Sequence, residues 1–96
     1  MSPVRKARYR SQAGIIYDIL RALYSEGEMP PTRITYYARL PYDRLKPMLK
    51  KLVEKGLLEE IHEKNRVYYK ITMKGYEALQ ELEKTKKLLE ALGMRF

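Results

Sequence analysis

Lysine side chains lie one helical turn apart in the segment YDRLKPMLKKLVEKG, residues 42–56. Lys46 and Lys50 are four residues apart, so a helix would present them side by side on one face. Ammonium groups placed in this way can bind phosphates or the acceptor atoms of guanine. Asn, Gln and paired Arg side chains distinguish bases most sharply, and the segment has none of them. We therefore expect a weak preference for base sequence.

Further polar and cationic residues occur in neighbouring segments. Thr32 and Arg33 open a helical pattern, where free backbone N–H groups and the helix dipole favour a phosphate. Tyr42 stands at the entry to the lysine-rich segment, and Lys64 and Arg66 lie in a short link between two strand patterns. We predict that nucleic acid contacts the following residues: Thr32, Arg33, Tyr42, Arg44, Lys46, Lys50, Lys51, Lys64 and Arg66.

The overall charge agrees with a polyanionic partner. The 96-residue chain has 20 Lys and Arg residues against 12 Asp and Glu, and its net charge is +8. A helix with several lysines on one face is often only a solvated surface. Here the basic residues form four clusters, in residues 1–10, 32–33, 44–51 and 64–66, which together favour double-stranded DNA.

Side chains suited to catalysis or metal binding are scarce. His62 is the single His, Cys is absent, and the only Asp residues are Asp18 and Asp43. The sequence has no Gly-rich phosphate loop and no His-Glu metal spacing, so we predict no enzymatic activity and no cofactor. No segment approaches the ~20 apolar residues of a membrane span, and we expect a cytoplasmic protein.

Apolar residues recur at helical spacing in the first part of the chain. Ser11 is the expected N-cap of a first helix, which Gly27 ends. A stiff connector with two prolines follows. Thr32 is the expected N-cap of a second helix that ends near Leu40.

The lysine-rich segment forms the third predicted helix. Asp43 is its expected N-cap and Gly56 its stop. Pro47 lacks a backbone N–H and crowds the preceding turn of a helix. We therefore expect this helix to start late or with a kink.

Two strands and a final helix complete the chain. Residues 57–62 and 67–71 read as strands, since Val67, Tyr69 and Ile71 alternate with polar neighbours. Asn65 suits a left-handed turn between them. Thr72 is the expected N-cap of a helix that reaches about residue 92.

Helix, turn, helix and hairpin in this order predict an α+β, mostly α, winged helix-turn-helix fold. It has three helices, a β-hairpin wing and an additional C-terminal helix. We divide the chain into a basic arm (residues 1–10), the winged helix-turn-helix domain (11–72) and a dimerisation helix (73–96).

The C-terminal helix has an apolar repeat with alternating spacings of three and four residues. This heptad pattern is typical of a coiled coil, because it places one stripe of residues against a partner helix. The alternative is that the helix folds back onto the first helix of the same chain. Under the favoured interpretation, a homodimer forms through Ala78, Leu82, Thr85, Leu89, Leu92 and Phe96.

Tyrosine is unusually frequent, with nine residues. Exposed rings could stack on the bases of single strands. We expect Tyr36, Tyr42 and Tyr68 to be exposed. Four other tyrosines are expected to lie at least partly in the core: Tyr17, Tyr24, Tyr37 and Tyr69.

The segments PTRITYYARLPYDRLKPMLKKLVEKGLLEE and YYKITMKGYEALQELE resemble a known family. It comprises the small archaeal winged-helix DNA-binding proteins of the ten-kilodalton chromatin-protein type. The likeness rests on the TRI-x-Y-x-A-x-L pattern of residues 32–40, on Tyr42, and on the T-x-K-G start of the last helix at residues 72–75. The resemblance implies a dimer held by an antiparallel coiled coil that binds duplex DNA.

These observations predict a dimeric duplex-DNA-binding protein that acts as a transcriptional regulator or as a nucleoid-associated chromatin protein. Two alternatives stay open, a winged-helix module for protein interaction and an RNA-binding module. The second alternative would favour single-stranded or A-form ligands over B-form duplex.

Overall fold

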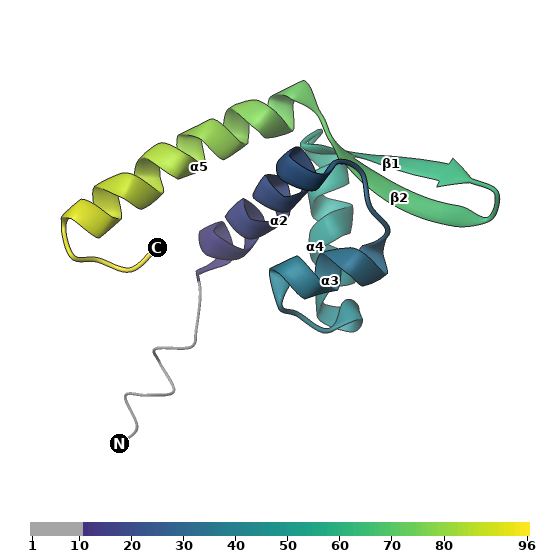
Figure 1. The fold of residues 1–96 in the computed structure, drawn as a ribbon, viewed down its shortest axis with the longest axis horizontal. Helices are drawn as coiled ribbons and strands as arrows, with labels where there is room; N and C mark the ends of the chain where they lie inside the picture. Colours follow the sequence, from purple (N-terminus) through teal and green to yellow (C-terminus); the bar gives the residue numbers. More distant parts are fainter. Residues whose placement is uncertain (1–10) are drawn as a thin grey trace, which may run out of the picture.

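The structure is a computed structural model that describes residues 11–96. The basic arm predicted for residues 1–10 lies outside this range. The helices are α2 (Gln12–Glu26), α3 (Pro31–Ala38), α4 (Tyr42–Glu54) and α5 (Met73–Ala91). The strands β1 (Leu58–Glu63) and β2 (Arg66–Ile71) form an antiparallel hairpin between α4 and α5 (Figure 1). The predicted winged helix-turn-helix architecture is confirmed.

Two of the predicted helix caps are confirmed by hydrogen bonds. The Ser11 hydroxyl accepts from the Gly14 amide at 3.0 Å and begins α2. The Thr72 hydroxyl accepts from the Gly75 amide, also at 3.0 Å, and begins α5. Gly27, with φ of +87°, ends α2 in a conformation that side chains disfavour.

The caps predicted for α3 and α4 are wrong. Pro30 and Pro41 stand at the N-cap positions instead of Thr32 and Asp43, with φ of −73° and −65°. The amides of Arg33 and Arg44, from which a capping side chain would accept, donate instead to the Pro30 and Pro41 carbonyls, both at 3.0 Å, so neither helix start needs a side-chain cap.

A late start of α4 is also wrong, because the helix begins at Tyr42 and contains Pro47. The backbone bond that Pro47 cannot donate would have reached the carbonyl of Asp43. Asp43 is an exposed residue in the first turn, where water can replace the missing donor. The helix therefore tolerates this proline.

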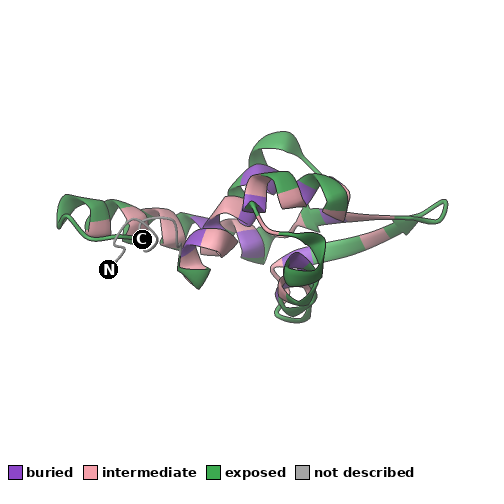
Figure 2. Ribbon diagram, turned by 90° about the horizontal axis from the view of Figure 1, so that it is seen from below, coloured by how far each residue is buried: buried purple, intermediate pink, exposed green. Residues whose placement is uncertain are grey.

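The core lies where α2, α3 and α4 meet (Figure 2). Each helix supplies apolar residues at spacings of three or four, so one stripe of each faces inward. Ile19, Leu20, Ile34 and Leu45 have no exposed surface, and Leu49 has 1%. This packing fixes the direction in which the opposite face of α4 points.

The hairpin is closed by a two-residue turn. Lys64 and Asn65 have φ of +49° and +64°, the left-handed pair of a type I′ turn, which matches the twist of the strands. Met29, in the connector between α2 and α3, pairs with Tyr69 through backbone hydrogen bonds of 2.9 and 3.2 Å. The wing is thereby fixed to the helical core as well as to α4.

The start of α5 is fixed at the base of the hairpin. The Thr72 hydroxyl donates to the Gly56 carbonyl at 2.6 Å, beyond the end of α4. Gly75 is buried, and a Cβ atom there would lie 2.1 Å from the Leu57 carbonyl oxygen. Gly75 therefore permits close backbone packing and does not belong to an exposed coiled-coil stripe.

Helix α5 lies alongside α2 (Figure 1). Leu79 joins the core with 6% exposure, and Tyr24 and Tyr76 place their ring centroids 5.0 Å apart. This is the fold-back arrangement that the sequence left as the alternative. The division of the chain at residue 72 stays a prediction.

The chain reverses after α5 and returns toward α2. Gly93, with φ of +72°, allows the Met94 amide to donate to the Leu89 carbonyl at 2.7 Å, as in a Schellman motif. Phe96 then meets Tyr17 edge to face, with ring centroids 5.7 Å apart. Phe96, one of the six residues predicted for dimerisation, therefore packs within the chain, as Ala78 and Leu82 also do.

Candidate nucleic-acid interface

The outer face of α4 is cationic and open to solvent. Leu45, Leu49 and Leu52 face the core and Met48 and Val53 pack against it, so the other residues of α4 are exposed. The exposed residues of α4 on the predicted contact list are Tyr42, Arg44, Lys46, Lys50 and Lys51. They lie on two sides of the helix: Tyr42, Lys46 and Lys50 are on the side toward the hairpin, whereas Arg44 and Lys51 are on the side toward α2.

Within residues 11–96, the cations of α4 have no carboxylate partners. In this part of the chain, the ion pairs involve α2, α5, Arg39 just after α3, and the wing residues Glu60 and His62, and none involves the lysines or the arginine of α4. Placing like charges close together without partners costs repulsion. Binding of a polyanion would remove this repulsion.

The start of α3 offers less to a phosphate than its sequence indicated. Pro30 and Pro31 occupy the first positions and have no backbone N–H. The Arg33 amide donates to the Pro30 carbonyl at 3.0 Å. In this first turn, only the Thr32 backbone amide is left to bind a ligand. Thr32 and the Arg33 side chain are both exposed.

The wing tip carries the remaining predicted contacts. Lys64 and Arg66 are exposed at the end of the hairpin, which projects away from the helices (Figure 1). No ion pair within residues 11–96 neutralises either side chain. The tip is free to approach a nucleic-acid backbone.

A groove runs between α4 and the hairpin. One part, of about 620 Å³, is bounded by the start of α3, by Tyr42 and Lys46, and by β2. A second part, of about 580 Å³, continues along α4 past Lys50. Glu60 and Tyr69 line both parts, and Glu54 lines the second, so the groove contains two carboxylates among its cations. We call this surface, with α4 and the wing tip, the α4–wing face.

Sequence reasoning missed Glu60, although a signal was present. Residues two apart in a strand share a face, so Glu60 lies on the same side of β1 as the buried Leu58. The prediction for Tyr24 is also wrong, because Tyr24 is 56% exposed and its ring packs on Tyr76 outside the core. Tyr36 and Tyr42 are exposed as predicted, at 83% and 47%.

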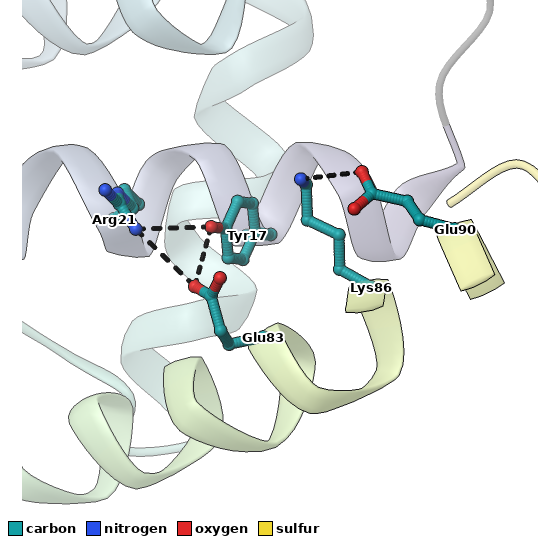
Figure 3. A network of polar contacts seen from close by, with 5 residues as sticks. All are labelled: Tyr17, Arg21, Glu83, Lys86 and Glu90. Atoms are coloured by element: carbon teal, nitrogen blue, oxygen red, sulfur yellow. Dashed lines mark hydrogen bonds and ion pairs between the residues drawn. The ribbon is translucent and has the colours of Figure 1, made fainter. Parts of the chain in front are cut away.

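The junction between α2 and α5 has a different character. The Tyr17 hydroxyl donates to Glu83 at 2.7 Å, and Arg21 lies 3.5 Å from the same carboxylate oxygen (Figure 3). Lys86 pairs with Glu90 at 2.9 Å and lies over the Tyr17 ring. Burial and the bond to Glu83 raise the pKa of Tyr17, and the bond to Glu90 raises the pKa of Lys86.

The other residues predicted for dimerisation divide between two environments. Ala78 and Leu82 are half-buried against the core, near the start of α5. Toward its end, Leu89 is half-buried, whereas Thr85 and Leu92 are exposed. Leu88, Leu92 and Met94 have exposures of 58%, 62% and 56%, so the end of α5 presents an apolar face to solvent.

The described part of the chain contains no arrangement of three acidic or His side chains that could hold a metal ion. Each helix within residues 11–96 is too short or too polar to span a lipid bilayer.

The family described as winged helix-turn-helix matches residues 9–90. The chain belongs to this family. Among solved structures, it is similar to Sso10a-2, a DNA-binding protein from Sulfolobus solfataricus. The two share 34% identity over 86% of this chain and 85% of that chain, with a TM-score of 0.79. The resemblance to small archaeal winged-helix proteins is thereby confirmed.

More distant winged helix-turn-helix structures show the same fold. The transcriptional regulator BldR, also from Sulfolobus solfataricus, shares 23% identity over 79% of this chain and 60% of that chain, with a TM-score of 0.67. Wild-type MarR from E. coli shares 19% identity over 77% of this chain and 57% of that chain, with a TM-score of 0.70. No curated protein matches the sequence.

Proposed function

We propose that this winged helix-turn-helix protein binds duplex DNA through the α4–wing face and acts as a transcriptional regulator or a nucleoid-associated protein. The observation that carries the proposal is the set of exposed α4 cations, which have no carboxylate partner in the described part of the chain. Its relative Sso10a-2 is a DNA-binding protein, which supports the same partner. The protein binds DNA at the chromosome in the cytoplasm and catalyses no reaction.

The shape of the α4–wing face suits a duplex. The major groove of B-form DNA is ~12 Å wide and admits one helix, so α4 can enter with Lys46 and Lys50 toward the bases or the groove walls. The hairpin then reaches the adjacent minor groove with Lys64 and Arg66. Thr32 and Tyr42 can contact phosphates beside the helix.

The direct test is fluorescence anisotropy with a random 30-base-pair duplex and an A·T-rich duplex over a series of salt concentrations. If six to eight phosphates are neutralised, the slope of log affinity against log salt is about −5 to −7. Similar affinities for the two probes would favour a nucleoid-associated role. A flat salt dependence, or no binding at low salt, would contradict the proposal.

Competition experiments separate the alternatives. Structured RNA added at equal salt should displace the protein from duplex DNA only weakly, because the A-form major groove is too narrow for α4. Stronger binding to RNA would favour the RNA-binding alternative. If charge reversal on α4 left the binding of a protein partner intact and duplex binding never occurred, the protein-interaction alternative would be favoured.

We also propose that two chains associate through the end of α5. The exposed Leu88, Leu92 and Met94 and the half-buried Leu89 form an apolar face that α2 does not cover. A second copy of the chain, with its helix set against this face, would bury the same residues on both sides. Sedimentation over a range of protein concentrations tests the association, and a monomer at all concentrations would contradict it.

A further inference from the structure

Two carboxylates, Glu54 of α4 and Glu60 of β1, line the groove of the α4–wing face, and only Glu60 lines both of its parts. Glu60 projects from β1 into the groove between the hairpin and α4, where it shares the lining with Lys46 and Tyr69. Its side chain is 39% exposed, so it is accessible to a ligand in the groove. Lys46 forms no ion pair with it.

Hydrogen bonding and strand register hold Glu60 in this position. Glu60 stands directly opposite Tyr69 across the hairpin, and the Tyr69 hydroxyl donates to its Oε2 atom at 3.1 Å. The His62 Nε2 atom lies 3.6 Å from the other carboxylate oxygen. Burial, followed by the charge of Glu60, raises the pKa of Tyr69 to about 12, so this donor keeps its proton in neutral solution.

The geometry of a duplex decides what meets this carboxylate, given the proposed function. A helix in the major groove and a hairpin in the adjacent minor groove must straddle one sugar-phosphate backbone, because that backbone separates the two grooves. The backbone would then run along the groove that Glu60 lines. Phosphates repel a carboxylate, and the repulsion acts on every base sequence.

We propose that Glu60 limits the affinity of the protein for duplex DNA by opposing phosphates in the groove between α4 and the wing. The residue offsets part of the attraction from the cations of α4. It thereby keeps general binding weaker than the positive charge of this face alone would make it. This inference rests on the proposed function.

The test compares Glu60→Gln with the matched control Glu59→Gln, using the full chain and the random 30-base-pair duplex at pH 8. Both substitutions remove one negative charge from neighbouring positions of β1. Gln at position 60 can still accept from Tyr69. Glu59 is exposed on the opposite face of the strand, opposite Lys70. Circular dichroism checks that each variant folds.

Glu60→Gln should bind the duplex roughly fivefold more tightly than the parent chain at low salt, and the gain should shrink as salt screens the repulsion. Glu59→Gln should change the affinity less than about twofold, because its charge lies farther from the groove. Glu60→Ala removes the same charge by a second route and should also tighten binding.

The outcomes separate this inference from the proposed function. Equal gains for the two Gln variants would overturn the inference, since net charge alone would explain them, and duplex binding would stand. Weaker binding by Glu60→Gln would also overturn it and would indicate a favourable contact with a base amino group. If the parent chain bound no duplex at low salt, the proposed function itself would fail.

Discussion

Charged side chains are arranged differently on the α4–wing face and at the junction between α2 and α5. At the junction, Arg21 meets Glu83 and Lys86 meets Glu90, so cations and carboxylates alternate and pair. On α4, Lys46 and Lys50 stand on an exposed helix face and form no such pair with any residue from 11 to 96. Exposed pairs stabilise a fold only modestly, whereas unpaired like charges slightly oppose folding.

We therefore expect substitutions in the two regions to change different properties of the protein. Substitutions at the junction should alter the free energy of unfolding and leave duplex binding nearly unchanged. Substitutions on the α4–wing face should alter duplex binding and leave stability nearly unchanged. The apolar end of α5 belongs to neither class, because its proposed partner is a second chain.

Gly75→Ala should have the largest effect, and it should fall on stability. The new Cβ would meet the Leu57 carbonyl oxygen at 2.1 Å, a backbone atom that cannot move aside without shifting α5. We expect a loss of roughly 3 kcal/mol in the free energy of unfolding, measured by urea denaturation.

The control for this prediction is Gly93→Ala, at the other end of α5. A Cβ there has open space, so the cost is only the left-handed backbone, about 1 kcal/mol. Equal losses at the two positions would mean that the contact at the start of α5 is unimportant.

Reversing two charges on α4 should produce the next largest effect. Lys46→Glu combined with Lys50→Glu should weaken binding to the random duplex by roughly a hundredfold, because two phosphate contacts become repulsive. The melting temperature should hardly change, since both side chains are exposed. Anisotropy and thermal denaturation measure the two quantities.

The matched control reverses two charges on α5, by Lys84→Glu and Lys87→Glu, and changes the net charge equally. Both residues are exposed, neither lines the groove, and they belong to α5, which runs away from the hairpin (Figure 1). If this control weakened binding as much as the α4 variant, the contrast between the two regions would not hold.

Leu88→Asp combined with Leu92→Asp should separate the two chains of the proposed dimer. The carboxylates would be buried against a second apolar helix, which is costly without partners. Loss of bivalency should then lower duplex affinity roughly tenfold. Sedimentation and anisotropy report the two changes.

Met73→Asp serves as the control, because Met73 is 72% exposed and lies at the opposite end of α5. It should leave both association and affinity unchanged. A Leu88→Asp, Leu92→Asp chain that still sediments as a dimer would exclude this face as the interface.

Glu83→Ala should have the smallest effect. It removes the acceptor of the 2.7 Å bond from Tyr17 and the partner of Arg21, in a partly buried setting. We expect a loss of about 1 kcal/mol in stability, with unchanged duplex affinity. Glu77→Ala, at an exposed position of the same helix, should lose less. A drop in duplex affinity would link the junction to the DNA-binding face.

Local features of the sequence predicted most of the fold. Helical periodicity located the four helices, and strand alternation located the hairpin to within a residue, because each element buries one face. Ser11, Thr72 and Asn65 were identified correctly because caps and turns depend on a few adjacent atoms. Thr32 and Asp43 were misassigned because a neighbouring proline sets the helix start without a side-chain cap.

The sequence by itself therefore determined the order of elements, the winged helix-turn-helix fold and the cationic face of α4. Only the tertiary structure decided that Met29 pairs with the wing, that Gly75 approaches Leu57 and that Glu60 faces α4 across a groove. It likewise decided that the apolar repeat of α5 packs against the core near the start of the helix and leaves apolar residues exposed near its end. The physical reason is that periodicity shows which residues share a face, whereas the neighbour of that face depends on packing between segments distant in the chain.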